Sequence, residues 1–324
     1  MLISPVLAPR VLGKIALVGL ASWLGLCASA RAQINFDQAA TLRWYADNAI
    51  TSFPIGNSPA GIAFDGACMW VASRNDLNVT KIHVNDGTIE RVTDLGTHAG
   101  NVAFDGFNIW VVLPDTNQLA KVSAADGVVV GKFQFPPGIK GIAYDGTRIW
   151  VSEDRSLSQP GAVWSVDVTT GRAFNGADVG VNPVAMAYDG ANLWVVNQDS
   201  NTVTKVRGWD ATVLGTFAVG TSPSAIAFDG TTMWVTSQGG NSITRLNLNG
   251  GKVAGYKVSS PTAIAFDGVD MWVTSSTSNT LMKLNGRDGK LRGTFPAGSA
   301  PSAIAFDGAN IWVVNGNSGT VSKM

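Results

Sequence analysis

One short pattern recurs seven times along this chain, and no other feature limits its fold so strongly. An aromatic residue, an aspartate and a glycine are followed by a tryptophan, as in "AFDGTTMW", residues 227 to 234. Successive copies lie 38 to 44 residues apart, a period typical of repeat proteins in which each unit packs against its neighbours. The aspartates are Asp65, Asp105, Asp145, Asp189, Asp229, Asp267 and Asp307, and the tryptophans are Trp70, Trp110, Trp150, Trp194, Trp234, Trp272 and Trp312.

Each unit divides into four short runs typical of β-strands. In the fifth unit these runs are "SAIAF", "MWVTS", "SITRLN" and "KVAGYKV", which are rich in β-branched and aromatic residues and too short for helices. The Asp-Gly pair joins the first two runs as a hairpin turn. Four antiparallel strands repeated about every 40 residues are typical of propeller blades. The sequence therefore predicts an all-β fold, a seven-bladed β-propeller whose repeats begin near residues 60, 100, 140, 184, 224, 262 and 302.

The two ends of the repeat region predict how the ring closes. The seventh unit reaches Met324 after only three strands. Near the other end, "AITSFPIG" (49–56) resembles the fourth-strand run "TVLGTFAVG" (212–220). We therefore expect 49–56 to complete the last blade, which would cover an otherwise unpaired sheet edge, so that the propeller spans 49–324.

The N-terminal segment has the pattern of a secretory signal peptide. Arg10 and Lys14 precede an apolar run at 15–30, which is followed by Arg31 and is short for a membrane span. We predict a signal peptide at 1–32, cleaved after Ala32 or alternatively after Ala30, and an N-terminal lead-in at 33–48. The expected location is periplasmic or extracellular, with no membrane insertion after the signal is removed.

Charge and cysteine content limit the expected partners of the mature chain. The signal segment holds three basic residues and no acidic ones, so the 23 basic residues fall to 20 against 23 acidic residues. This balance offers no positive footprint for nucleic acid or anionic lipid. Cys68 is then the one remaining cysteine, so we expect a free thiol and no internal disulfide.

The repeated aspartate and tryptophan are expected to be structural, because a catalytic group is needed once and not seven times. The aspartate side chain would orient the tight turn, and the tryptophan would pack between blades. A basic residue also recurs at one position of six third strands, while blade three has Ser165 there. Either it has a partner, such as the turn aspartate, or it belongs to a solvated outer rim. The basic residues are Lys81, Lys121, Lys205, Arg245, Lys283 and Lys323.

Function is expected where the units differ. The loops between second and third strands should share one face, here called the top face, with the loops that lead into each blade. Those of blades five to seven contain only small or uncharged polar residues ("QGGN", "STSN", "GNSG"). The loops of the first four units carry charged residues, and blade three has a longer loop. We predict a ligand-binding patch there, centred on 153–160, and the alternative is a set of solvated loop charges. The candidate residues are Arg74, Asp76, His98, Asp115, Lys140, Glu153, Asp154, Arg155 and Asp199.

The stretch "MWVTSQGGNSITRLN", continuing to "GGKVAGYKVSSPTAIAFDG", resembles the YVTN/NHL-type repeat of bacterial propellers. The resemblance covers nearly the whole mature chain and implies a propeller. The chain is also distantly similar to the streptogramin (virginiamycin B) lyase family, whose blades carry Trp-Phe-Thr-Glu and Pro-His-Gly stretches. Only Glu153 matches the acid of that pattern. The family's histidine position maps onto Ala60, Gly100, Lys140, Val184, Ser224, Thr262 and Ser302, so lyase activity is not expected.

These features favour a binding module over an enzyme. No catalytic residue, metal-ligand set or cofactor is predicted, since His83 and His98 come from unrelated positions of the repeat. The expected partner of this monomer is a protein, a peptide or an envelope glycan held on the top face. The alternative is a lyase- or hydrolase-type enzyme that uses Glu153, Asp154 and His98. A quinoprotein-like cofactor propeller is a third class, for which the sequence shows neither a docking motif nor paired cysteines.

Overall fold

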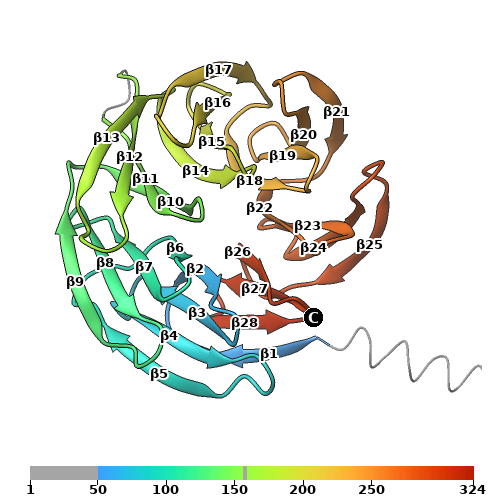
Figure 1. The fold of residues 1–324 in the computed structure, drawn as a ribbon. Helices are drawn as coiled ribbons and strands as arrows, with labels where there is room; N and C mark the ends of the chain where they lie inside the picture. The colour runs from blue at the N-terminus through green and yellow to red at the C-terminus, as the bar shows by residue number, and fades with distance from the viewer. Residues whose placement is uncertain (1–49, 156–158) are drawn as a thin grey trace, which may run out of the picture. The chain divides into compact units, whose positions relative to one another are not determined.

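The computed structural model describes residues 50–155 and 159–324, and within these ranges every regular element is a β-strand. Figure 1 shows seven four-stranded antiparallel sheets arranged around a central axis, as blades of a propeller. The predicted all-β, seven-bladed fold is therefore confirmed.

The strands follow one another outward from the axis in each blade. The first three blades are β2 to β5 (Pro59–Phe64, Cys68–Ser73, Asn78–His83, Ile89–Asp94), β6 to β9 (Val102–Phe104, Asn108–Leu113, Gln118–Ser123, Val129–Gln134) and β10 to β13 (Ile139–Tyr144, Arg148–Glu153, Ala162–Asp167, Ala173–Asp178). The next three are β14 to β17 (Pro183–Tyr188, Asn192–Asn197, Thr202–Arg207, Val213–Ala218), β18 to β21 (Pro223–Phe228, Thr232–Ser237, Ser242–Asn247, Lys252–Lys257) and β22 to β25 (Pro261–Phe266, Asp270–Ser275, Thr280–Asn285, Leu291–Pro296).

The last blade combines both ends of the propeller. It consists of β26 to β28 (Pro301–Phe306, Ile311–Asn315, Thr320–Lys323) and of β1 (Thr51–Pro54) as its outer strand. β1 pairs antiparallel with β28, from Thr51 opposite Lys323 to Pro54 opposite Thr320. The predicted closure by an N-terminal strand is thus confirmed.

The predicted signal peptide (1–32) and lead-in (33–48) lie outside the described residues and stay predictions. Within the described part of the chain, no helix has the length and apolar character needed to cross a membrane.

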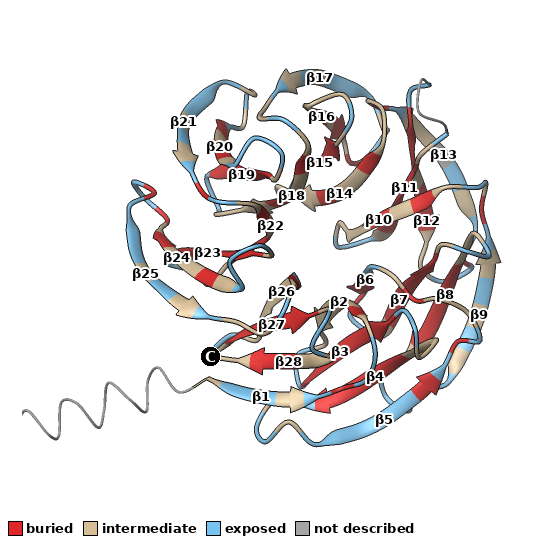
Figure 2. Ribbon diagram, turned by 180° about the vertical axis from the view of Figure 1, so that it is seen from behind, coloured by how far each residue is buried: buried red, intermediate tan, exposed pale blue. Residues whose placement is uncertain are grey.

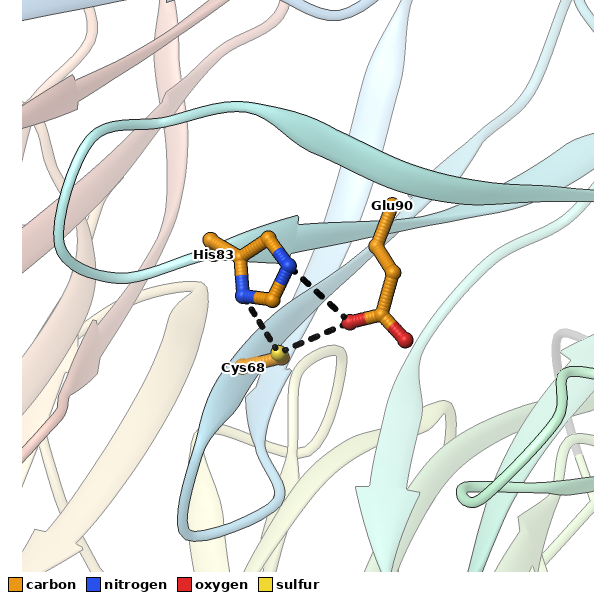
Figure 3. Close-up of side chains that lie close together, drawn as sticks. All are labelled: Cys68, His83 and Glu90. Atoms are coloured by element: carbon orange, nitrogen blue, oxygen red, sulfur yellow. Dashed lines mark hydrogen bonds and ion pairs between the residues drawn. The ribbon is translucent and has the colours of Figure 1, made fainter.

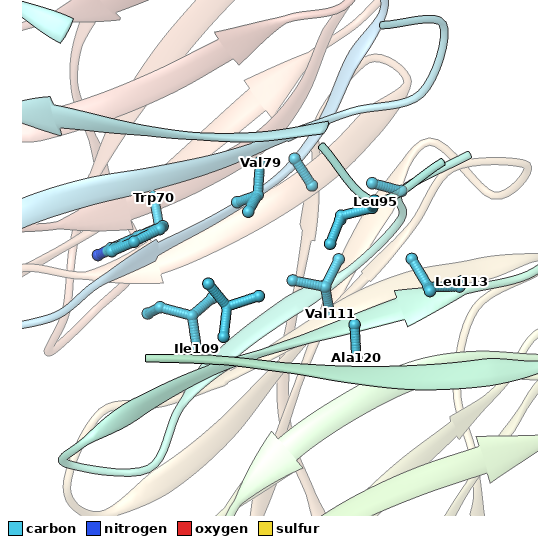
Figure 4. Close-up of a cluster of buried hydrophobic side chains, with 10 residues drawn as sticks. Trp70, Val79, Leu95, Ile109, Val111, Leu113 and Ala120 are labelled. Atoms are coloured by element: carbon cyan, nitrogen blue, oxygen red, sulfur yellow. The ribbon is translucent and has the colours of Figure 1, made fainter. Parts of the chain in front are cut away.

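Burial changes in a regular way from strand to strand. The second strand of a blade is buried along its length, as in β19, whereas the fourth strand alternates exposed and half-buried residues, as in β17 (Figure 2). The core therefore lies between blades. Figure 4 shows one such layer, in which Trp70 and Val79 of blade one pack with Ile109 and Val111 of blade two and with Leu95 of the connecting segment.

A bond between the repeated aspartate and tryptophan recurs in all seven blades. Each indole N–H donates to the carboxylate five residues earlier, at 2.6 to 2.8 Å. The other carboxylate oxygen accepts the backbone N–H groups of the turn, as Asp105 does from Phe107 and Asn108 at 2.8 and 2.6 Å. The carboxylate therefore closes the hairpin and also satisfies an indole N–H that is buried between blades.

The basic residues of the third strands have partners in the fold, which rules out the solvated-rim interpretation for them. All six lie over the tryptophan of their own blade, with the cation 4.8 to 5.6 Å from the ring centre. Four of them also donate to a backbone carbonyl of the next blade at 2.5 to 2.6 Å, as Lys121 does to Val168. In blade three, where Ser165 takes this position, a cavity of about 420 Å³ lies between Ser165 and the exposed Trp209.

Candidate functional site

The two sets of loops that were expected to share the top face do lie together. Lys140, which was expected in an entry loop, is the second residue of β10 and forms an ion pair with Asp154, directly after β11, at 2.8 Å. In blade two, His98 Nδ1 lies 2.7 Å from Asp115 Oδ2, which likewise connects the entry segment with the loop after the second strand. In blades two and three, the loop after the second strand therefore lies next to the start of the first strand, as expected for a shared top face.

A cavity of about 580 Å³ opens on this face, at the mouth of the axial channel. Its walls come from blades seven, one, two, three and four, and its polar lining includes Ser58, Asn101, Ser302 and Asn317. Asn101 and Ser302 also line the narrower space of about 270 Å³ formed by the inner strands along the axis. The cavity is therefore continuous with the channel, and it combines hydroxyl and amide groups with apolar walls.

Within the described ranges, the charged side chains that line the cavity are both cations, and one of them is paired with an acid just outside the lining. Among the described residues that line it, only Arg74 and Lys140 are charged. Lys140 is held in place by Asp154 and by Asn182 Oδ1, at 2.8 and 2.6 Å. Arg74 is exposed, and within 50–155 and 159–324 no ion pair joins it to an acid. A free guanidinium beside a fixed ammonium suits a carboxylate or phosphate group.

Two of the predicted acids hold loops together and are not directed into the cavity. Asp76 accepts the backbone N–H of Asn57 at 2.6 Å and its side-chain amide at 2.9 Å. Asp199 accepts the amide of Asn182 at 3.2 Å. Their carboxylates therefore shape the loops around the cavity.

The expectation that Glu153 is an exposed loop charge is wrong. Glu153 is the last residue of β11 and is 5% exposed. Its Oε2 accepts the indole N–H of Trp164 at 2.7 Å and lies 3.4 Å from Arg155 Nε, while Arg155 also pairs with Asp178 at 2.7 Å. The strand extends further than the sequence suggested because these partners satisfy the carboxylate. The described residues of 153–160 do not line the cavity, which lies beside them, and 156–158 are outside the described ranges.

Sequence reasoning missed a cluster at the opposite end of blade one. Figure 3 shows Cys68, His83 and Glu90 converging from β3, β4 and β5. Cys68 Sγ lies 3.6 Å from His83 Nδ1 and 3.4 Å from Glu90 Oε2, and His83 Nε2 is 3.4 Å from the same oxygen. The signal was present in the strand register, because Cys68 pairs directly with His83 across β3 and β4.

The cluster does not have the properties of an activated nucleophile. Cys68 is free and buried, and burial, together with its hydrogen bond to Glu90, raises the pKa of the thiol to about 11. The thiol is therefore protonated at neutral pH, whereas nucleophilic cysteines are exposed and have a lowered pKa. Sulfur, nitrogen and oxygen atoms in such proximity are instead a set that can hold a metal ion.

Comparison with known proteins supports the fold and leaves the function open. No family model matches the chain, and no curated protein matches it. Among solved structures, a catalytically inactive virginiamycin B lyase from Staphylococcus aureus with quinupristin has a TM-score of 0.72 and 19% identity, over 85% of this chain and 98% of that one. A streptogramin B lyase has a TM-score of 0.71 and 16% identity, over 85% and 96%. Hydrazine synthase of Kuenenia stuttgartiensis has a TM-score of 0.66 and 16% identity, over 83% and 96%.

These identities show a shared fold alone. By their names, two of the neighbours are lyases and the third is a hydrazine synthase, so the fold by itself does not indicate one chemistry. The distant similarity to the streptogramin lyase propellers is thereby confirmed at the level of the fold.

Proposed function

We propose that this propeller is an exported, monomeric binding module that holds an anionic group of a peptide, protein or envelope glycan at the mouth of its channel. The observation that carries the proposal is the top-face cavity of about 580 Å³, in which Arg74 and Lys140 are the only charged residues among those described. Its volume falls in the range of small-ligand sites, which suits one residue of a peptide or one sugar unit.

The state of the two cations supports binding of an anion. The ammonium of Lys140 is already fixed by Asp154 and Asn182, so little side-chain freedom is lost when a ligand arrives. Arg74 supplies the donors that are still free on the cavity wall. The predicted signal segment, which precedes the described residues, supports placement in the periplasm or outside the cell.

The test compares ligands that differ only in charge. Calorimetry of the full chain would use peptides with a free C-terminal carboxylate against the same peptides as amides, and a carboxylate-containing envelope glycan against its ester. Arg74→Gln should weaken binding of the anionic form at least tenfold, about 1.4 kcal/mol. The matched control is Arg287→Gln, because Arg287 is exposed at the opposite end of blade six and should leave binding unchanged. Equal affinity for the amide, or loss of binding in the control, would contradict the proposal.

One observation favours an enzyme as the second candidate. His98 and Asp115 form a pair at the rim of the cavity, next to the lining residues Gly100 and Pro114. A carboxylate that orients an imidazole is the arrangement of a general base. In that case, His98→Gln would remove turnover of a bound envelope ligand and keep its binding. Binding without any conversion of the ligand by the wild-type chain would favour the module.

A further inference from the structure

We propose that Cys68, His83 and Glu90 form a binding site for a thiophilic divalent metal ion, zinc in the first place, at the end of blade one opposite the top face. One ligand atom from each residue lies within 4.8 Å of the other two. A thiolate, an imidazole and a carboxylate are the three ligand types that zinc takes in proteins. The site is separate from the top-face cavity, so the proposal of a metal site and the proposal of an anion-binding cavity can be tested independently.

The spacing of the three groups fits tetrahedral coordination. Zinc–ligand bonds of about 2.0 to 2.3 Å at tetrahedral angles place ligand atoms about 3.3 to 3.6 Å from one another. The observed distances from Sγ are 3.4 Å to Oε2 and 3.6 Å to Nδ1. The imidazole now directs one nitrogen to the sulfur and the other to the carboxylate. It is half exposed, so the ring is free to turn until one nitrogen faces both groups.

The three residues are particular to blade one, although the positions they occupy exist in the other blades. Strand pairing places the corresponding residues side by side: Asn108, Ser123 and Val130 in blade two; Asn192, Arg207 and Leu214 in blade four; Thr232, Asn247 and Val253 in blade five. The fold therefore does not require a metal-ligating residue at any of them. The whole chain has two cysteines, two histidines and two glutamates, and one of each meets here.

The surrounding charges also fit a bound cation. Lys81 Nζ lies 2.9 Å from Glu90 Oε1, which leaves Oε2 directed at the sulfur and holds the carboxylate as an outer-shell partner would. A metal-bound thiol gives up its proton, so the thiolate and the carboxylate supply two negative charges to the divalent ion, and Lys81 shares the carboxylate through its other oxygen. The side chains of His83 and Glu90 are 48% and 37% exposed, so an ion can arrive from solvent and keep a water as its fourth ligand.

The test is direct metal binding to the full chain after treatment with a chelator. Titration with Co²⁺ should give a thiolate charge-transfer band that saturates at one ion per chain, and Zn²⁺ should displace the cobalt. Cys68→Ser should abolish that band, and His83→Ala and Glu90→Gln should each weaken Zn²⁺ binding at least tenfold. The matched control is His98→Ala, which removes the other histidine and should leave both readouts unchanged.

Three results would overturn the proposal. The first is the failure of the wild-type chain to take up zinc in stoichiometric amount, measured by mass spectrometry, which needs no variant. The second is a charge-transfer band that persists in Cys68→Ser. The third is loss of zinc binding in His98→Ala with normal binding in His83→Ala. Loss of anion binding in Arg74→Gln would concern only the proposed top-face binding function and would not change the evidence for the metal site.

Discussion

Replacing Asp229 by alanine tests whether the repeated Asp–Trp bond stabilises the ring. In the fold this carboxylate accepts the indole N–H of Trp234 at 2.7 Å, the hydroxyl of Thr232 at 2.6 Å and an N–H of Arg245 at 3.2 Å. Trp234 is fully buried, so its N–H cannot turn to water, and an unsatisfied buried donor costs about 1 to 3 kcal/mol. Arg245 would lose its carboxylate in a site where its side chain is 12% exposed, which adds about 1 kcal/mol.

The expected loss for Asp229→Ala is therefore about 3 kcal/mol in the free energy of unfolding, measured by urea denaturation at pH 7. The control is Asp288→Ala, whose exposed carboxylate accepts one backbone N–H and pairs with Lys290 in solvent, so the expected loss is much smaller than that of Asp229→Ala. Equal losses in the two variants would refute the structural role of the Asp–Trp bond.

Acid titration of the same residue gives a second measurement. Burial acts to raise the pKa of Asp229, but hydrogen bonds from Thr232, Trp234 and Thr231 lower it from 3.8 to about 2. Since the folded pKa lies below the unfolded one, the charged form stabilises the fold above about pH 4, and this contribution is lost as the pH falls toward 2. The difference in unfolding free energy between wild type and Asp229→Asn should narrow over that interval. A difference that stays constant from pH 5 downward would contradict this reasoning.

Three further changes test the ring and its exceptions. Deleting 33–54 removes β1 and should abolish cooperative thermal unfolding, followed by circular dichroism; a soluble variant with wild-type melting would contradict closure. Ser165→Lys places a cation over Trp150, as in the other six blades, and should raise stability by about 0.5 to 1 kcal/mol in urea; unchanged stability would count against it. Glu153→Ala should cost about 2 kcal/mol because the indole of Trp164 loses its acceptor, and a cost below about 0.5 kcal/mol would show that this bond is dispensable.

The elements that the sequence predicted best are those for which local pattern and long-range packing coincide. The Asp-Gly turn joins two strands that are adjacent in the chain, so the spacing of the seven turns predicted the seven blades. The tryptophan that follows each turn also predicted a buried second strand. Closure by β1 was also predictable, because 49–56 keeps the residue pattern of a fourth strand.

The candidate site was less accessible to sequence reasoning, because its properties depend on pairings between strands and blades. Glu153 looked like a loop charge because its acceptor role depends on Trp164, which lies opposite Val151, two residues before Glu153, in the β11–β12 ladder. The convergence of Cys68 with Glu90 depends on a register shift between β4 and β5, and no local pattern reveals it. The cavity likewise requires Arg74 and Lys140, which are 66 residues apart in the chain, to line the same space from different blades.

The repeat itself explains why such sites can arise at single blades. In a repeat protein each unit contacts only its neighbours, so losing one stabilising interaction changes one interface and leaves the others intact. Ser165 illustrates this: blade three lacks the lysine or arginine that lies over the tryptophan in the other six blades, and the ring still closes. The same tolerance allows Cys68 to stand where other blades have turn-capping asparagine or threonine. A position that four blades use to cap the turn is therefore open to a different side chain in blade one, at a cost of about one local interaction.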